Sequence, residues 1–159
     1  MFERIKKLIR LMLSLIYTFF IERKQHGDLL IINSTSRITG SKKVVKTGVG
    51  DRLSKSMLGN IGIHLSASIS DIYIDRSCYI ASGVKIFSAN HDFVDFDMLK
   101  TKGDIIIGKD CWVGANSIIL SGVQLGDRTV VAAGSVVTKS FVHGSVLIGG
   151  VPAKIMKRI

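Results

Sequence analysis

The chain has 159 residues, of which 47% are hydrophobic and 21% are charged, and its formal net charge is +10. These values suit one globular domain and exclude wholesale disorder. Residues 1–50 carry ten Lys or Arg against three Asp or Glu, whereas residues 51–159 carry twelve against nine. This uneven distribution argues against a nucleic-acid-binding protein whose positive charge is spread over the whole chain. Two cysteines without a CxxC motif predict neither a disulfide scaffold nor a structural zinc site, and they indicate a reducing compartment.

Residues 1–26 are predicted to form an amphipathic helix. The uncharged stretch at residues 11–21 is too short to span a membrane, and no small-residue cleavage site follows it. Apolar residues follow helical spacing at Ile5, Leu8, Ile9, Met12, Ile16, Phe19 and Phe20. Such a helix either lies on an anionic membrane surface or packs on its own domain or on a neighbouring subunit. Both interpretations stay open on the sequence.

The rest of the chain has a six-residue period. An aliphatic residue recurs at Ile107, Val113, Ile119, Leu125, Val131 and Val137. The same frame occurs earlier at Ile74, Ile80 and Ile86, and a looser version runs from about residue 30 to residue 70 through Ile38, Val44 and Val49. This period predicts short strands and tight turns that repeat around a prism, so we expect an all-β solenoid over residues 27–150. Cys78 and Cys111 fall in an inward column and are expected to fill space in the core rather than act as nucleophiles.

The repeat frame fails once, and we expect residues 87–106 to form an active-site loop. This loop contains His91 with Asp92, Asp95 and Asp97 nearby. A neutral imidazole titrates near the working pH and can take a proton from a hydroxyl group, so His91 is the candidate base. Asn90 and Asp92 are candidates for hydrogen bonding a substrate, although both also suit a solvated loop. His64 is a weaker candidate for the substrate cleft.

The segment IGKDCWVGANSIILSGVQLGDRTVVAAGSVVTKS, followed by GVPAKIMKRI, closely resembles the hexapeptide-repeat acyltransferases. The galactoside and maltose O-acetyltransferases and the related polysaccharide O-acetyltransferases are the nearest branch. The resemblance is strong over residues 74–157 and weak before residue 61. It implies a left-handed parallel β-helix of hexapeptide repeats, a homotrimer with active sites between neighbouring subunits, and acetyl-CoA as the donor. It also implies that His91 is the catalytic base, although the family's common Thr-His-Pro is Asn-His-Asp here.

The same resemblance implies a cofactor site in the later repeats and in a C-terminal cofactor-binding tail at residues 151–159. Trp112 is expected to form a flat wall beside the cofactor arm, or else to lie at a subunit interface. Lys154 and Lys157 match basic residues near the nucleotide phosphates. The full set of expected acetyl-CoA contacts is Trp112, Gly114, Ala115, Ala133, Thr138, Lys139, Lys154 and Lys157. Backbone N–H groups of the turn at residues 112–115 are expected to stabilise the oxyanion.

Together these features predict an acetyl-CoA-dependent O-acetyltransferase that acts on a sugar hydroxyl, of a cell-surface saccharide or its precursor. The transfer is expected to be direct, with His91 as general base and with no metal. We expect a cytoplasmic homotrimer, peripheral on the inner face of the cytoplasmic membrane through residues 1–26, and no nucleic-acid partner. The alternatives are an inactive solenoid scaffold at the membrane and an O-acetyltransferase for a non-sugar molecule such as serine or an antibiotic. A γ-type carbonic anhydrase is disfavoured because its metal needs three converging histidines.

Overall fold

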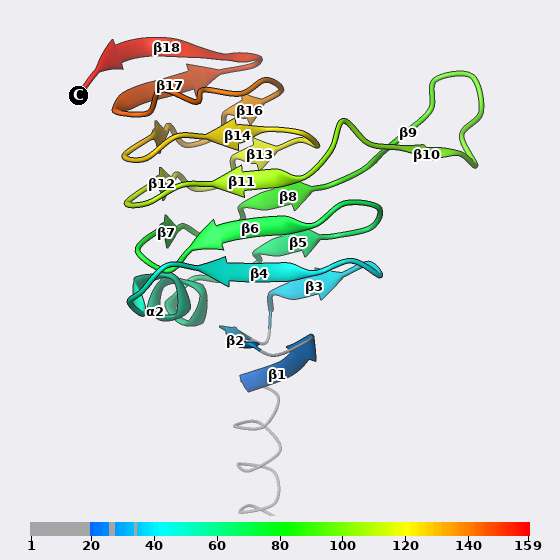
Figure 1. Ribbon diagram of the computed structural model, residues 1–159, viewed down its shortest axis with the longest axis horizontal. Helices are drawn as coiled ribbons and strands as arrows, with labels where there is room; N and C mark the ends of the chain where they lie inside the picture. Colours follow the sequence, from blue (N-terminus) through cyan, green and yellow to red (C-terminus); the bar gives the residue numbers. More distant parts are fainter. Residues whose placement is uncertain (1–19, 26–27, 34) are drawn as a thin grey trace, which may run out of the picture.

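The computed structural model of the protein describes residues 20–25, 28–33 and 35–159. Residues 35–159 form a stack of short strands that runs from β3 at one end to β18 at the other (Figure 1). The strands belong to three sheets, which are parallel except for the last strand of one of them. This arrangement is that of a parallel β-helix and is consistent with the left-handed form that the family resemblance implies.

The three sheets are named here in the order in which the chain visits them, and each corner is named by the two sheets that it joins. Sheet I contains β3 (Arg37–Thr39), β5 (His64–Ser66), β8 (Lys85–Phe87), β13 (Ile118–Ile119) and β16 (Val136–Val137). Sheet II contains β4 (Val44–Thr47), β6 (Ile72–Asp75), β11 (Ile105–Ile107) and β14 (Gln124–Leu125). Sheet III contains β7 (Tyr79–Ile80), β12 (Trp112–Val113), β15 (Val130–Val131), β17 (Val146–Gly150) and β18 (Ala153–Arg158).

The six-residue period of the sequence is the period of the buried core. The aliphatic residues of the frame from Ile74 to Val137 are each at most 2% exposed, and they form one column on each sheet. The columns are Ile74, Ile107 and Leu125 on sheet II, Ile80, Val113 and Val131 on sheet III, and Ile86, Ile119 and Val137 on sheet I. Coils stack closely at the corners, where a Cβ on Gly114 would lie 2.6 Å from the carbonyl oxygen of Val131 and 2.7 Å from the nitrogen of Ala133. Glycine is therefore required at this position by the backbone of the next coil.

The looser frame predicted for the first coils is wrong at Val49, which is 87% exposed. Helix α2 (Arg52–Gly59) follows it and occupies the place of a strand of sheet III. Leu53 and Met57 are four residues apart and both are buried, which is helical spacing rather than a six-residue period. Ser56 Oγ accepts a hydrogen bond from the Ile80 amide at 3.1 Å, so the helix closes the β7 edge of sheet III.

The N-terminal helix predicted for residues 1–26 lies outside the described residues as far as residue 19. Its last part is corrected, because β1 (Phe20–Gln25) is a strand that pairs antiparallel with β2 (Asp28–Asn33). The register runs from Phe20 opposite Asn33 to Gln25 opposite Asp28. The sequence Leu-Leu-Ile-Ile at residues 29–32 favours an extended strand, and the ladder pairs the inward-facing backbone groups of the two segments. Within the described residues, no helix has the length and apolar character needed to cross a membrane.

The chain leaves the regular coil after β8 and rejoins it at β11. The excursion contains a short antiparallel hairpin of β9 (Asn90–His91) and β10 (Leu99–Lys100), in which His91 pairs with Leu99. It begins at the I/II corner and projects away from the stack (Figure 1). We call residues 88–104 the hairpin loop.

Candidate active site

His91 is held at the base of the hairpin loop with one ring nitrogen engaged. Its Nδ1 lies within hydrogen-bond distance of the carbonyl oxygen of Phe96, across the hairpin. A carbonyl oxygen only accepts, so the neutral imidazole donates its Nδ1–H to Phe96 and carries a lone pair on Nε2. The side chain is exposed, and Nε2 is therefore accessible to a substrate hydroxyl. This is the geometry that a general base requires.

Asp92 shapes the loop that carries His91. Its carboxylate forms an ion pair with Lys100 and accepts hydrogen bonds from the amides of Val94 at 2.7 Å and Asp95 at 3.2 Å. The Lys100 contact first, and then the two amides, hold the pKa of Asp92 below its usual range. Three partners take up most of the accepting capacity of the carboxylate, so its first role is to order the loop. Asn90 lies opposite Lys100 at an exposed position of the hairpin.

The tip of the hairpin loop exposes a set of large apolar side chains. The exposed fraction is 94% for Phe93, 94% for Val94 and 72% for Phe96. Apolar residues gathered in this way on a projecting loop indicate a surface that another molecule covers.

His64 lies on sheet I below the hairpin loop. Its Nε2 is 2.9 Å from Thr39 Oγ1, and its ring packs edge-on against Phe87, with 5.4 Å between ring centroids. Burial first, and then the charges of Arg37 and Lys85, lower the pKa of His64 from its usual value. His64 is thus fixed and neutral close to the point where the loop leaves the coil.

Two of the expected cofactor contacts offer free amides at the III/I corner. Ala115 and Ala133 occupy equivalent positions in consecutive coils, and the Gly134 amide donates to the Ala115 carbonyl at 2.8 Å. Over residues 35–159, the amides of Ala115 and Ala133 donate to no carbonyl. Stacked, exposed N–H groups of this kind suit the carbonyl groups of an extended ligand arm.

The expected oxyanion donors at residues 112–115 are corrected in part. The Trp112 amide donates to the Thr129 carbonyl at 3.0 Å, and the Gly114 amide donates to the Val131 carbonyl at 2.9 Å. Both amides are used to hold the coils together and are not available to a ligand. Ala115 is left as the candidate donor of this turn.

The remaining expected cofactor contacts lie either on sheet III or at the I/II corner. Lys154 lies opposite Gly149 near the III/I corner, and Lys157 lies opposite Leu147 further along sheet III. Thr138 and Lys139 follow β16 at the I/II corner, where the Lys139 ammonium lies 5.8 Å from the Phe141 ring centroid. Trp112 is 52% exposed on the outer face of sheet III.

Sheet III and the I/II corner are on opposite sides of a three-sided prism. Trp112 belongs to β12 of sheet III, whereas the hairpin loop with His91 starts at the I/II corner. Strand β12 and the hairpin of β9 and β10 lie on different sides of the stack in Figure 1. One chain therefore does not bring Trp112 and His91 together.

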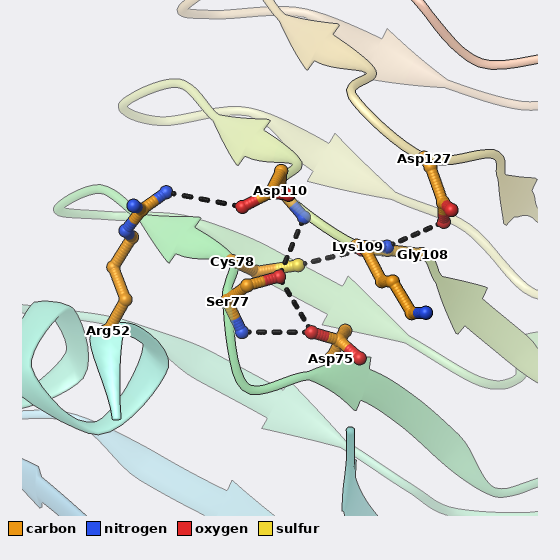
Figure 2. Close-up of polar contacts among 8 residues, drawn as sticks. All are labelled: Arg52, Asp75, Ser77, Cys78, Gly108, Lys109, Asp110 and Asp127. Carbon is orange, nitrogen blue, oxygen red and sulfur yellow. Dashed lines mark hydrogen bonds and ion pairs between the residues drawn. The ribbon is translucent and has the colours of Figure 1, made fainter. Parts of the chain in front are cut away.

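The II/III corner holds both cysteines in a network of structural hydrogen bonds. Ser77 donates its hydroxyl to Asp75 at 2.6 Å, while the Asp110 amide donates to Ser77 Oγ at 2.7 Å (Figure 2). The Cys78 thiol donates to the Gly108 carbonyl at 2.9 Å. Contact with Cys111, together with burial, raises the pKa of the Cys78 thiol. Cys78 and Cys111 are 0% and 1% exposed, so both fill the core as expected and neither is placed as a nucleophile.

The sequence missed two parts of the site. The Phe96 carbonyl that orients His91 is a backbone group, so no residue type reveals it. The second part is the Asx turn in which the Asp92 carboxylate accepts a hydrogen bond from the Val94 amide. An Asp at the start of a loop is the sequence signal for such a turn. In the part of the chain that the structure describes, no three His, Cys, Asp or Glu side chains are grouped so as to hold a metal ion.

The comparisons with known proteins agree with this architecture. Residues 104–139 match the family described as "Hexapeptide repeat of succinyl-transferase". The "Probable macrolide acetyltransferase" of Lysinibacillus sphaericus is 33% identical over 120 residues, which are 62% of this chain and 66% of that protein. The "Putative lipopolysaccharide biosynthesis O-acetyl transferase WbbJ" of Escherichia coli (strain K12) is 36% identical over 108 residues, which are 60% of this chain and 54% of that protein. In neither case does the match reach two thirds of the relative's own length.

A solved structure adds a bound ligand to these likenesses. A hexapeptide-repeat acetyltransferase from Vibrio cholerae O1 biovar eltor, complexed with acetyl coenzyme A, has a TM-score of 0.51 and 26% identity. The similarity covers 79% of this chain and 61% of that one.

Proposed function

Because this chain belongs to the hexapeptide-repeat acetyltransferase family, we propose that it transfers an acetyl group from acetyl-CoA to a hydroxyl group of a saccharide. The observation that carries the proposal is His91, whose Nδ1 is engaged by the Phe96 carbonyl and whose exposed side chain leaves Nε2 accessible to an acceptor. An alcohol is a poor nucleophile at neutral pH, so a base at this position supplies what the transfer needs.

In the proposed reaction, His91 Nε2 removes the proton from the acceptor hydroxyl. The oxygen of that hydroxyl attacks the thioester carbonyl, and the Ala115 amide donates to the oxyanion that forms. His91 then returns its proton to the leaving thiolate, so that a protein nucleophile is not needed. Acetyl-CoA supplies the activated acetyl group for this direct transfer.

The donor is proposed to lie along the III/I corner of the later coils. The free amides of Ala115 and Ala133 fit the amide-rich arm of coenzyme A, and Lys154 beside them fits its phosphates. A Cβ on Gly114 would meet the backbone of the next coil, and this close packing keeps the two amides one coil apart.

We place the complete site between protomers of a homotrimer. His91 and the donor-binding corner lie on different sides of one chain, so a neighbouring copy has to bring its corner to the hairpin loop. The apolar side chains at the tip of that loop, led by Phe93 and Val94, give the loop a surface that such a neighbour covers.

Two of the relatives indicate classes of acceptor. The similarity to WbbJ supports a cell-surface saccharide or its precursor, and the similarity to a macrolide acetyltransferase keeps an antibiotic as the second candidate. Peripheral attachment to the inner face of the cytoplasmic membrane through residues 1–26 would suit a lipid-linked saccharide.

The test is release of free coenzyme A from acetyl-CoA with a panel of sugars, lipid-linked saccharides and macrolides. His91→Ala should lower kcat for the best acceptor by about 100-fold or more and leave the fold intact, because His91 is exposed and supports no core. The matched control is His143→Ala, which removes another exposed histidine at the II/III corner and should leave kcat within about twofold. Retention of more than roughly a third of the rate by His91→Ala would exclude His91 as the base.

A further inference from the structure

Three basic residues stand side by side on the outer face of sheet I. Arg37 on β3 pairs in register with His64 on β5, and His64 pairs in register with Lys85 on β8. Paired residues of parallel strands point to the same side of a sheet, and strands are spaced about 4.8 Å apart. The three side chains therefore form one row, which we call the cationic row.

The cationic row has no acidic partner. Among the residues that the structure describes, neither the Arg37 guanidinium nor the Lys85 ammonium forms an ion pair or a hydrogen bond, and both side chains are exposed. The charged groups that act on the His64 ring are Arg37 and Lys85, both cationic. Arg37 and Lys85 carry like charges two strands apart, and their repulsion does not stabilise the fold. Such a concentration of positive charge is the complement of an anionic ligand.

The cationic row ends where the hairpin loop begins. Lys85 lies two residues before Phe87, from which the chain leaves the coil, and Phe87 packs against His64. Beyond Lys85, the same register continues through Ile118 and Val136, so the outer face of sheet I changes from cationic to apolar at the level of the loop. The expected donor contacts belong to the later coils, on the apolar side of this boundary. The cationic side is left for the acceptor.

We propose that Arg37, His64 and Lys85 bind an anionic group of the acceptor, a phosphate or a carboxylate, and thereby present its hydroxyl group to His91. The inference rests on the proposed function and narrows its acceptor to an acidic or phosphorylated saccharide. Arg37 offers a planar fork that pairs with two oxygens of either anion, and Lys85 offers a point charge two strands away. His64, fixed by Thr39 and Phe87, lies between them.

The binding test follows the Cε1–H proton resonances of the four histidines of the full-length protein by NMR. His64→Gln assigns the His64 signal. Addition of pyrophosphate at low salt should shift this signal saturably and move the titration midpoint of His64 upward, because a bound anion favours imidazolium. The His143 signal should not move. Arg37→Gln/Lys85→Gln should weaken the apparent affinity by about tenfold or more, since two charge-assisted contacts are lost.

The matched control is Lys109→Gln/Arg128→Gln. It removes two exposed positive charges as well, but at the II/III corner, on the side of the prism opposite sheet I. Its affinity for pyrophosphate should stay within about twofold of the unmodified protein. If the control loses as much affinity for pyrophosphate, binding depends only on the net charge of the protein, and the proposal is overturned.

The source of the anion is distinguished with glucose, glucose 1-phosphate and glucuronate. A shift of the His64 signal by glucose 1-phosphate alone identifies a phosphate site, a shift by glucuronate alone identifies a carboxylate site, and glucose should give none. No response to pyrophosphate, glucose 1-phosphate or glucuronate overturns the proposal. The His91→Ala protein should bind all probes with unchanged affinity, because binding of the anion does not need the base. If the unmodified protein binds the probes but transfers no acetyl group, the proposed function fails and the anion site stands.

Discussion

Ser56→Ala tests how the solenoid is closed at its first complete coil. Ser56 is 4% exposed in α2, and its Oγ accepts a hydrogen bond from the Ile80 amide at 3.1 Å. Ile80 is fully buried in β7, the edge strand of sheet III, so its amide has no access to water once the hydroxyl is removed.

The size of the effect follows from this geometry. An unsatisfied buried donor costs about 1–3 kcal/mol, and the gain in helix propensity from Ser to Ala returns about 0.5 kcal/mol. The free energy of unfolding should therefore fall by about 0.5–2.5 kcal/mol. For a chain of this size each kcal/mol corresponds to about 2–4 °C, so the Tm should drop by roughly 1–10 °C.

Thermal unfolding followed by circular dichroism measures this change. Ser54→Ala on the same helix is the control, because Ser54 is half-buried and, in the described structure, its side chain makes no hydrogen bond. It receives the same propensity gain and should unfold at an equal or slightly higher temperature. If Ser56→Ala is no less stable than Ser54→Ala, the hydroxyl does not cap the edge of sheet III and the reasoning is wrong.

Three further outcomes are expected. Asp92→Asn should lower kcat several-fold with little change in Tm, because the ion pair with Lys100 that orders the loop around His91 is lost; kcat and Tm of the two proteins at neutral pH check this. Lys154→Ala/Lys157→Ala should raise the KM for acetyl-CoA several-fold at low salt with kcat unchanged, and less so at high salt; an unchanged KM at low salt would count against this phosphate site. Deletion of residues 2–19 should abolish sedimentation with anionic liposomes while the protein stays trimeric and active on a soluble acceptor, whereas a fall to monomers would show that the segment is structural.

The regular part of the fold was predictable because one physical requirement repeats along the chain. Each inward aliphatic, from Ile107 to Val137, stacks on its equivalent in the next coil, so a six-residue period in the sequence maps directly onto the core. The first coils follow another pattern. There Leu53 and Met57 have helical spacing, and reading Val49 as part of the repeat hid the helix that follows it.

The sequence predicts the parts of the candidate site that depend on the type of a side chain. It does not predict the parts that depend on backbone groups, because any residue type supplies those. The place of His91 in the break of the repeat predicts it as the candidate base, but the carbonyl of Phe96 that engages its ring comes from the folded hairpin. The amides of Trp112 and Gly114 could not be excluded as oxyanion donors from the sequence, because their acceptors lie one coil away. The cationic row likewise joins residues 27 and 21 positions apart, a register that only the structure fixes.

Subunit complementation tests whether His91 acts as the base in a site that a neighbouring protomer completes. His91→Ala homotrimers lack the proposed base, and Trp112→Ala homotrimers lack the side chain expected beside the cofactor arm, so each should have strongly reduced activity. When equal amounts of the two variants assemble at random, one site in four over the whole mixture combines an intact His91 from one chain with an intact Trp112 from another. Acetyl transfer should therefore recover to about a quarter of that of the unmodified protein. A mixture no more active than the mean of the two single-variant homotrimers would show that both residues serve the reaction from the same chain, or that one of them has no part in it. Either result would contradict a site that is shared between protomers.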